Sequence, residues 1–124
     1  MKHDVLIIDD EVRFATMLSK RLSLRGYTCD VVYDGESGLA LLARQGFNLV
    51  ILDLRLPGLS GEEVLEQIKK IQPDLPVIIL TGHGNEKERE TCMRLKAHAF
   101  LNKPVDLVEL VCIFDEIVKP VQGT

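Results

Sequence analysis

The hydrophobic positions of the chain fall into short continuous runs, separated by longer segments with helical spacing. Each run has about four to six residues and is rich in β-branched or aromatic side chains. Continuous apolar runs, unlike alternating ones, are typical of strands buried on both faces of a parallel sheet. The predicted strands are Asp4–Ile8, Thr28–Tyr33, Asn48–Leu52, Val77–Leu80 and Ala97–Leu101.

The intervening segments carry apolar stripes and helix-start signals. Helix starts are predicted at Asp10, at Asp34, at the capping boxes Ser60–Glu63 and Asn85–Glu88, and at Pro104. Leu39, Leu42 and Ala43 are expected to face inward on the second helix, and the fifth helix is expected to run to Pro120. Alternating strands and helices predict a (βα)5 α/β fold, a doubly wound five-stranded parallel sheet with helices on both faces.

The fifth predicted helix has more apolar residues than one core-facing stripe needs. At 100° per residue, one arc holds Leu107, Leu110, Val111, Phe114, Ile117 and Val118. Val108 and Cys112 fall off this arc on one side and Ile113 on the other, so they are candidates for an interface. The fourth helix has few apolar positions, which predicts a thinly anchored, mobile element.

Composition fits one ordinary globular domain spanning residues 1–124, with 46% hydrophobic and 27% charged residues. The net charge is −4 and no Lys/Arg-rich run occurs, which argues against direct nucleic-acid binding. The three cysteines form no CxxC pair, and no stretch has the length of a signal peptide core or a membrane span. We therefore expect a cytoplasmic protein with free thiols and no membrane partner.

Polar side chains stand where the predicted strands end. Asp9 and Asp10 follow the first strand, Asp53 the third, Thr81 the fourth and Lys103 the fifth. In an open parallel α/β sheet the ligand site lies at the carboxyl ends of the strands, so these groups are expected to converge. Helix capping is the alternative explanation for the two adjacent acids, but it accounts for only one of them.

Clustered carboxylates without paired His or Cys predict a Mg²⁺ site, because a hard divalent cation prefers oxygen ligands and relieves the repulsion. A metal opposite Lys103 suits a phosphoryl group. Asp53 stands alone at its strand end and is the expected nucleophile, while Asp9 and Asp10 are better placed as metal ligands.

The set Asp9-Asp10, Asp53 followed by LRLPGLSG, Thr81-Gly82 and Lys103-Pro104 resembles the receiver domain of two-component response regulators. The resemblance covers essentially the whole chain. It implies a flavodoxin-like, chemotaxis-regulator-like fold with strand order 2-1-3-4-5. It also implies a regulatory protein that is no free-standing enzyme but catalyses its own phosphorylation and dephosphorylation.

The resemblance further implies a role for each matching position. Asp53 would accept a phosphoryl group from a sensor histidine kinase or a histidine phosphotransfer protein. Asp10 would bind Mg²⁺ directly and Asp9 mainly through water, with Asp53 and the backbone carbonyl of Arg55 as further ligands. Thr81 would bond a phosphoryl oxygen.

Lys103 would pair with the acyl phosphate, aimed by a cis bond to Pro104. Phe100 would be the aromatic switch that follows Thr81. Phosphorylation would then reshape the face of the fourth helix, fifth strand and fifth helix, which an output domain, an effector or a second copy would read. Arg55 and His83 could tune loss of the phosphoryl group, or could be solvated loop residues.

Two positions depart from the family pattern. Lys96-Ala97 replaces a common Gly-Ala, so the loop before the fifth strand could differ in shape or strain. Phe100 lacks the hydroxyl of the equally familiar Tyr.

The alternatives to a phosphorylated receiver domain are a Mg²⁺-dependent phosphatase of the haloacid dehalogenase type, a flavin-binding module and a receiver-like interaction module that is not phosphorylated. The first would have DxD rather than DDE after strand one, and the second a hydroxyl-rich loop there.

Overall fold

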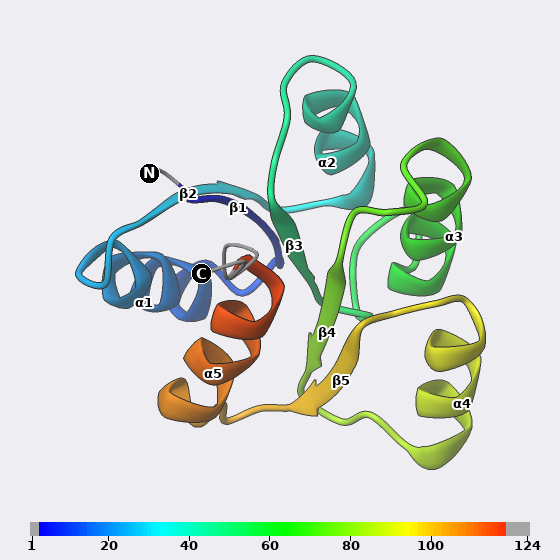
Figure 1. Cartoon of the computed structure of the whole chain (residues 1–124). Helices are drawn as coiled ribbons and strands as arrows, with labels where there is room; N and C mark the ends of the chain where they lie inside the picture. Colours follow the sequence, from blue (N-terminus) through cyan, green and yellow to red (C-terminus); the bar gives the residue numbers. More distant parts are fainter. Residues whose placement is uncertain (1–2, 119–124) are drawn as a thin grey trace.

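A single parallel sheet forms the centre of the computed structural model, which describes residues 3–118. Its five strands are β1 (His3–Ile8), β2 (Tyr27–Val32), β3 (Leu49–Leu52), β4 (Val77–Thr81) and β5 (Ala99–Asn102). They lie in the order β2-β1-β3-β4-β5, with every neighbouring pair parallel. The predicted fold and strand order are therefore confirmed (Figure 1).

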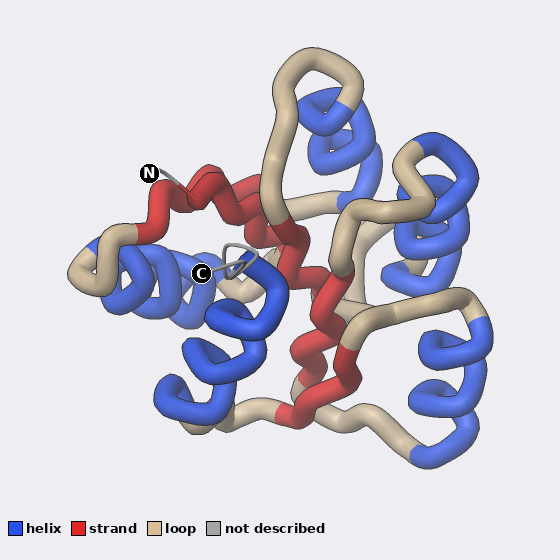
Figure 2. Tube along the Cα trace, viewed as in Figure 1, coloured by secondary structure: helices blue, strands red, loops and turns tan. Residues whose placement is uncertain are grey.

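Five helices connect the strands and cover both faces of the sheet (Figure 2). They are α1 (Val12–Ser23), α2 (Gly35–Leu42), α3 (Gly61–Ile71), α4 (Glu86–Arg94) and α5 (Leu107–Val118). Helices α1 and α5 lie on one face, and α2, α3 and α4 lie on the other (Figure 1). None of the helices in the described part of the chain is long and apolar enough to cross a membrane.

Each central strand contributes to two separate cores. In β1, Val5 and Ile7 pack with α1 and α5, whereas Leu6 and Ile8 pack with α2, α3 and α4. Successive strand residues point to opposite faces, so a strand covered on both sides needs apolar residues at every position. This geometry explains the continuous hydrophobic runs in the sequence.

The structure confirms some of the predicted helix caps but not all of them. Asp34, Ser60 and Asn85 cap α2, α3 and α4, the last two in complete capping boxes. The predicted cap at Asp10 is wrong: Glu11 is the N-cap of α1 and makes no side-chain capping bond. The Asp9 carboxylate instead accepts from the Glu11 N–H at 2.9 Å, because the chain turns there before the helix begins at Val12.

Two helix limits also differ from the prediction. Helix α5 begins at Leu107 rather than Pro104, because the Asp106 carboxylate accepts from the Val108 N–H at 3.0 Å. The predicted end at Pro120 lies outside the described residues. Helix α2 ends at Leu42, so Ala43 is its C-cap and is exposed rather than inward-facing.

The surface of α5 agrees only in part with its helical wheel. Val108 is 63% exposed and Cys112 is exposed, but Ile113 is partly buried and packs against the core beneath α1 and α5. The width of the arc that a helix buries depends on its placement over the sheet, which spacing along one helix does not determine.

The residue after the C-cap of α4 has a left-handed conformation although it is not glycine. Lys96 has φ 76°, and the N–H groups of Lys96 and Ala97 bond the carbonyls of Met93 and Cys92, both at 3.0 Å. This is the Schellman pattern, in which glycine is usual because a Cβ is disfavoured at positive φ. The departure from Gly-Ala seen in the sequence therefore places backbone strain before β5.

Candidate functional site

The candidate site lies at the carboxyl edge of the sheet, where β1 and β3 are neighbours and their chains leave toward opposite faces. Asp9 and Asp53 are the first residues after these strands. The Asp53 N–H donates to the Ile8 carbonyl at 3.0 Å, and the Asp9 N–H donates to the Val32 carbonyl at 3.1 Å. Both acids are thus held by the sheet at a topological switch point, the usual ligand position in this kind of fold.

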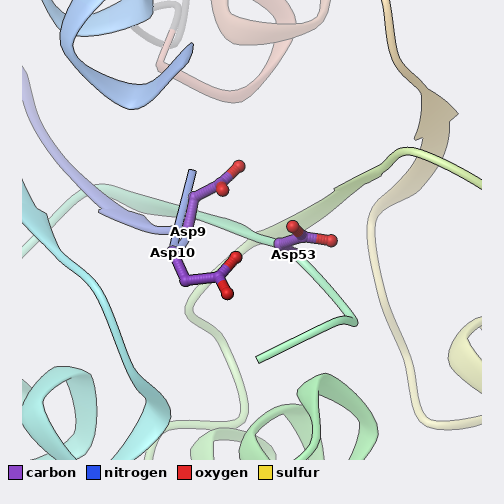
Figure 3. Close-up of side chains that lie close together, drawn as sticks. All are labelled: Asp9, Asp10 and Asp53. Atoms are coloured by element: carbon purple, nitrogen blue, oxygen red, sulfur yellow. The ribbon is translucent and has the colours of Figure 1, made fainter. Parts of the chain in front are cut away.

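Three carboxylates gather there. Oxygen atoms of Asp9, Asp10 and Asp53 lie within 4.8 Å of one another, and Figure 3 shows the side chains together beyond the ends of the two strands. Asp9 is 1% and Asp53 3% exposed, whereas Asp10 is exposed. Burial raises the pKa of Asp9, although a hydrogen bond from Lys103 acts in the opposite direction.

Lys103 supplies the positive charge of the cluster. Its Nζ lies 2.8 Å from Asp9 Oδ2 and 3.3 Å from Asp53 Oδ2, and it also pairs with Glu11. The ammonium is 4.4 Å from the centre of the Phe14 ring. Burial alone would lower the pKa of Lys103, but the bonds to Asp9 and Glu11 outweigh burial and raise it. The peptide bond between Lys103 and Pro104 is cis.

Thr81 provides a hydroxyl without a partner. Its side chain is fully buried, and within the described part of the chain Oγ1 makes no hydrogen bond. Leaving a buried polar group unsatisfied costs about 1–3 kcal/mol, so such a group is a natural place for a ligand oxygen.

Phe100 lies close to the loop that follows Thr81. A Cβ added at Gly84 would stand 2.5 Å from Phe100 Cζ and 2.9 Å from Thr81 Cγ2. The glycine thus leaves room for the ring next to this loop. Phe100 is partly buried and packs against the core beneath α2, α3 and α4.

Arg55 connects the loop after β3 to α4. Its backbone N–H donates to Asp53 Oδ1 at 3.3 Å, while its guanidinium pairs with Glu88 and donates to the His83 carbonyl at 3.1 Å. The hydrogen bond between Arg55 and Glu88 raises the pKa of the arginine and lowers that of the glutamate. His83 itself is exposed at the edge of this group.

The site contains residues that the sequence did not assign. Glu11 completes the charge cluster, and its position directly after Asp9-Asp10 was the available signal. Phe14 and Glu88 carried no such signal, because their partners lie far away in the sequence. Val108, Cys112 and Ile113 lie on α5.

The fold and the site together define a doubly wound α/β protein with an acidic cluster, an ion-paired lysine and a buried free hydroxyl at one sheet edge. Residues 5–115 match the family described as the response regulator receiver domain. The chain therefore belongs to the receiver domains of two-component response regulators, which are regulatory rather than classical enzymes.

Similar proteins of known sequence support this family assignment. The uncharacterized transcriptional regulatory protein YkoG of Bacillus subtilis is 36% identical over 110 residues, 89% of this chain and 48% of YkoG. The nitrogen assimilation regulatory protein NtrX of Azorhizobium caulinodans is 34% identical over 121 residues, 96% of this chain and 27% of NtrX. The chain thus spans about half and about a quarter of these two proteins.

The structure also resembles solved receiver domains. A CheY-like response regulator receiver domain protein from Methanospirillum hungatei superposes with a TM-score of 0.90 at 28% identity. The match covers 94% of this chain and 93% of the other.

Proposed function

We propose that this receiver domain accepts a phosphoryl group on Asp53 and uses it to control an output domain or partner. The observation that carries the proposal is the ion-paired contact of the nearly buried Asp53 with Lys103, at the same sheet edge as the unpartnered hydroxyl of Thr81. These are a nucleophile, a cation for the phosphoryl oxygens and a free hydrogen-bond donor.

The cluster fits a magnesium ion. Asp9, Asp10 and Asp53 offer only oxygen, within the spacing that one ion requires, and the repulsion among them calls for a cation. In our proposal Asp10 and Asp53 bind Mg²⁺ directly, Asp9 binds mainly through water, and the carbonyl of Arg55 completes the protein ligands. Bound Mg²⁺ would neutralise charge on the transferring phosphoryl oxygens.

The transfer itself would be an in-line displacement. An Asp53 carboxylate oxygen attacks the phosphorus of a phosphohistidine, an O–P bond forms, and the P–N bond breaks with its electron pair on the imidazole nitrogen. Lys103 then pairs with the phosphoryl oxygens in place of the carboxylates that it contacts before transfer. Water later attacks the phosphorus of the acyl phosphate, the bond between phosphorus and the Asp53 oxygen breaks, and inorganic phosphate leaves as the Asp53 carboxylate is restored.

The readout would begin at Thr81. Its hydroxyl donates to a phosphoryl oxygen, and Phe100 moves into the space that becomes available beside it. The face formed by α4, β5 and α5 changes shape in consequence, which is a local charge change biasing a two-state surface.

Sensor histidine kinases or histidine phosphotransfer proteins are the proposed phosphoryl donors. YkoG is named a transcriptional regulatory protein and NtrX a nitrogen assimilation regulatory protein, and both are longer than this chain, which supports an output domain or effector as the partner. A homodimer through α4, β5 and α5, with Val108, Cys112 and Ile113 in the contact, stays a prediction. The same holds for one domain over residues 1–124, a cytoplasmic location and the absence of direct nucleic-acid binding by this domain.

Incubation with acetyl phosphate and Mg²⁺, read by intact mass, tests the proposal. The wild-type chain should gain one phosphoryl group, and the Asp53→Asn variant should gain none. A chain that stays unmodified would support the interaction module that is not phosphorylated. The family match leaves the phosphatase and flavin-binding alternatives without support.

A further inference from the structure

The guanidinium of Arg55 is held by the start of α4 rather than by the site next to it. It forms a two-point pair with Glu88, including a 3.1 Å hydrogen bond from Nη2 to Oε1, and the same Nη2 donates to the His83 carbonyl. Arg55 is also fixed at its backbone, where its N–H donates to Asp53 Oδ1. One residue therefore contacts the proposed phosphoacceptor through its main chain and α4 through its side chain.

Glu88 also caps the N-terminus of α4. It is the third residue of the helix and closes the capping box: its N–H donates to Asn85 Oδ1 at 2.8 Å, and its Oε1 accepts from the Asn85 N–H at 3.2 Å. The ion pair with Arg55 thus ties the loop after β3 to the residues that start the helix. Helix α4 has one fully buried side chain, Cys92, so each further attachment of this helix matters.

A phosphoryl group would be a strong competitor for this guanidinium. It carries a charge of about −1.5 to −2 and three acceptor oxygens, against a single negative charge on Glu88. Arginine binds such oxygens through paired N–H groups. The Arg55 side chain is 52% exposed, so the guanidinium can turn without disturbing the core.

We propose that Glu88 and the phosphoryl group on Asp53 compete for Arg55, so that Glu88 limits how tightly the site holds its phosphoryl group. Arg55 then binds the phosphoryl group directly, and its departure from Glu88 loosens the start of α4, whereas Glu88 acts on the site only through Arg55. This inference rests on the proposed phosphorylation of Asp53. It adds a residue outside the site, Glu88, that weakens the binding of the phosphoryl group by holding Arg55.

Glu88→Gln isolates the competition, because glutamine also serves in a capping box while lacking the charge. Glu86→Gln is the matched control, since Glu86 is exposed in the same first turn. Beryllofluoride with Mg²⁺ serves as an unreactive stand-in for the phosphoryl group, and titration calorimetry measures its affinity. The Glu88→Gln variant should bind about twofold to fivefold more tightly, the range expected for an exposed ion pair, and Glu86→Gln should match the wild type.

Arg55→Gln completes a double-mutant cycle with Glu88→Gln. In that background Glu88→Gln should no longer change the affinity, because no guanidinium remains to be released. Amide hydrogen exchange gives a second readout: beryllofluoride should speed exchange at residues 85–89 in the wild type but not in Glu88→Gln, where exchange should be fast from the start.

The outcomes separate this inference from the proposed function. If the wild type binds beryllofluoride while Glu88→Gln binds with the same affinity, the competition is wrong. It is equally wrong if Glu88→Gln has the same effect with and without Arg55. If the wild type fails to bind, or Asp53→Asn binds as well, the proposed function falls and the inference falls with it.

Discussion

Replacing Lys103 with glutamine should expose the electrostatic cost of the acidic cluster. The Lys103 side chain is 10% exposed and its Nζ contacts Asp9 and Asp53, which are 1% and 3% exposed. Glutamine keeps much of the volume but removes the only cation that the described residues place in contact with both acids. The two buried carboxylates would then face each other, and Asp10, without compensation.

The expected loss of unfolding free energy follows from the burial of the ion pairs that Lys103 forms with Asp9 and Asp53. Removing one partner of a buried ion pair costs about 3–5 kcal/mol. Asp9 can take up a proton in the variant, which limits the cost, so we expect about 3 kcal/mol at pH 7.5 without Mg²⁺. At about 4 °C per kcal/mol for a domain of this size, Tm should fall by about 12 °C.

The loss should depend on pH with a definite sign. Since burial raises the pKa of Asp9 in the folded state, the folded chain binds a proton more readily than the unfolded chain as the pH falls toward that pKa. Protonation of Asp9 therefore favours folding at lower pH, and the variant should lose less stability at pH 5 than at pH 7.5. Added Mg²⁺ should recover more stability in the variant than in the wild type.

Thermal unfolding by circular dichroism at both pH values, with Mg²⁺ or with chelator, measures these effects. Lys70→Gln is the control, because Lys70 is exposed on α3 and should leave Tm nearly unchanged. The reasoning would be refuted if Lys103→Gln without Mg²⁺ were as stable as the wild type at pH 7.5, or lost equal stability at both pH values.

Three further predictions concern the backbone, the aromatic ring and the metal. Lys96→Gly should raise the unfolding free energy in urea by about 1 kcal/mol by relieving the positive φ, and no gain relative to Lys96→Ala would contradict it. Gly84→Ala should displace the Phe100 ring and shift its NMR signals, whereas Gly82→Ala, with open space around its Cβ, should leave them in place. Mg²⁺ at ten times its Kd should stabilise the wild type by about 1.4 kcal/mol, and an equal rise in Tm for Asp10→Asn would contradict the assigned ligands.

The sequence alone determined the layout of the fold and the position of the side chains that form the candidate site. Strands covered on both faces need continuous apolar runs, and parallel strands bring their carboxyl ends to one edge, so the sequence pattern alone places Asp9, Asp53, Thr81 and Lys103 together. Capping boxes could be read as well, because their bonds join residues three apart.

Only the tertiary structure decided which groups touch across the chain. The pairing of Arg55 with Glu88, the contact of Lys103 with Glu11 and the partial burial of Ile113 depend on the distances and tilts between elements that are far apart in sequence. Even the start of α1 was set by the turn that leaves the sheet after Asp9, rather than by the capping preference of Asp10. Local preferences are small, and long-range packing overrides them where the two conflict.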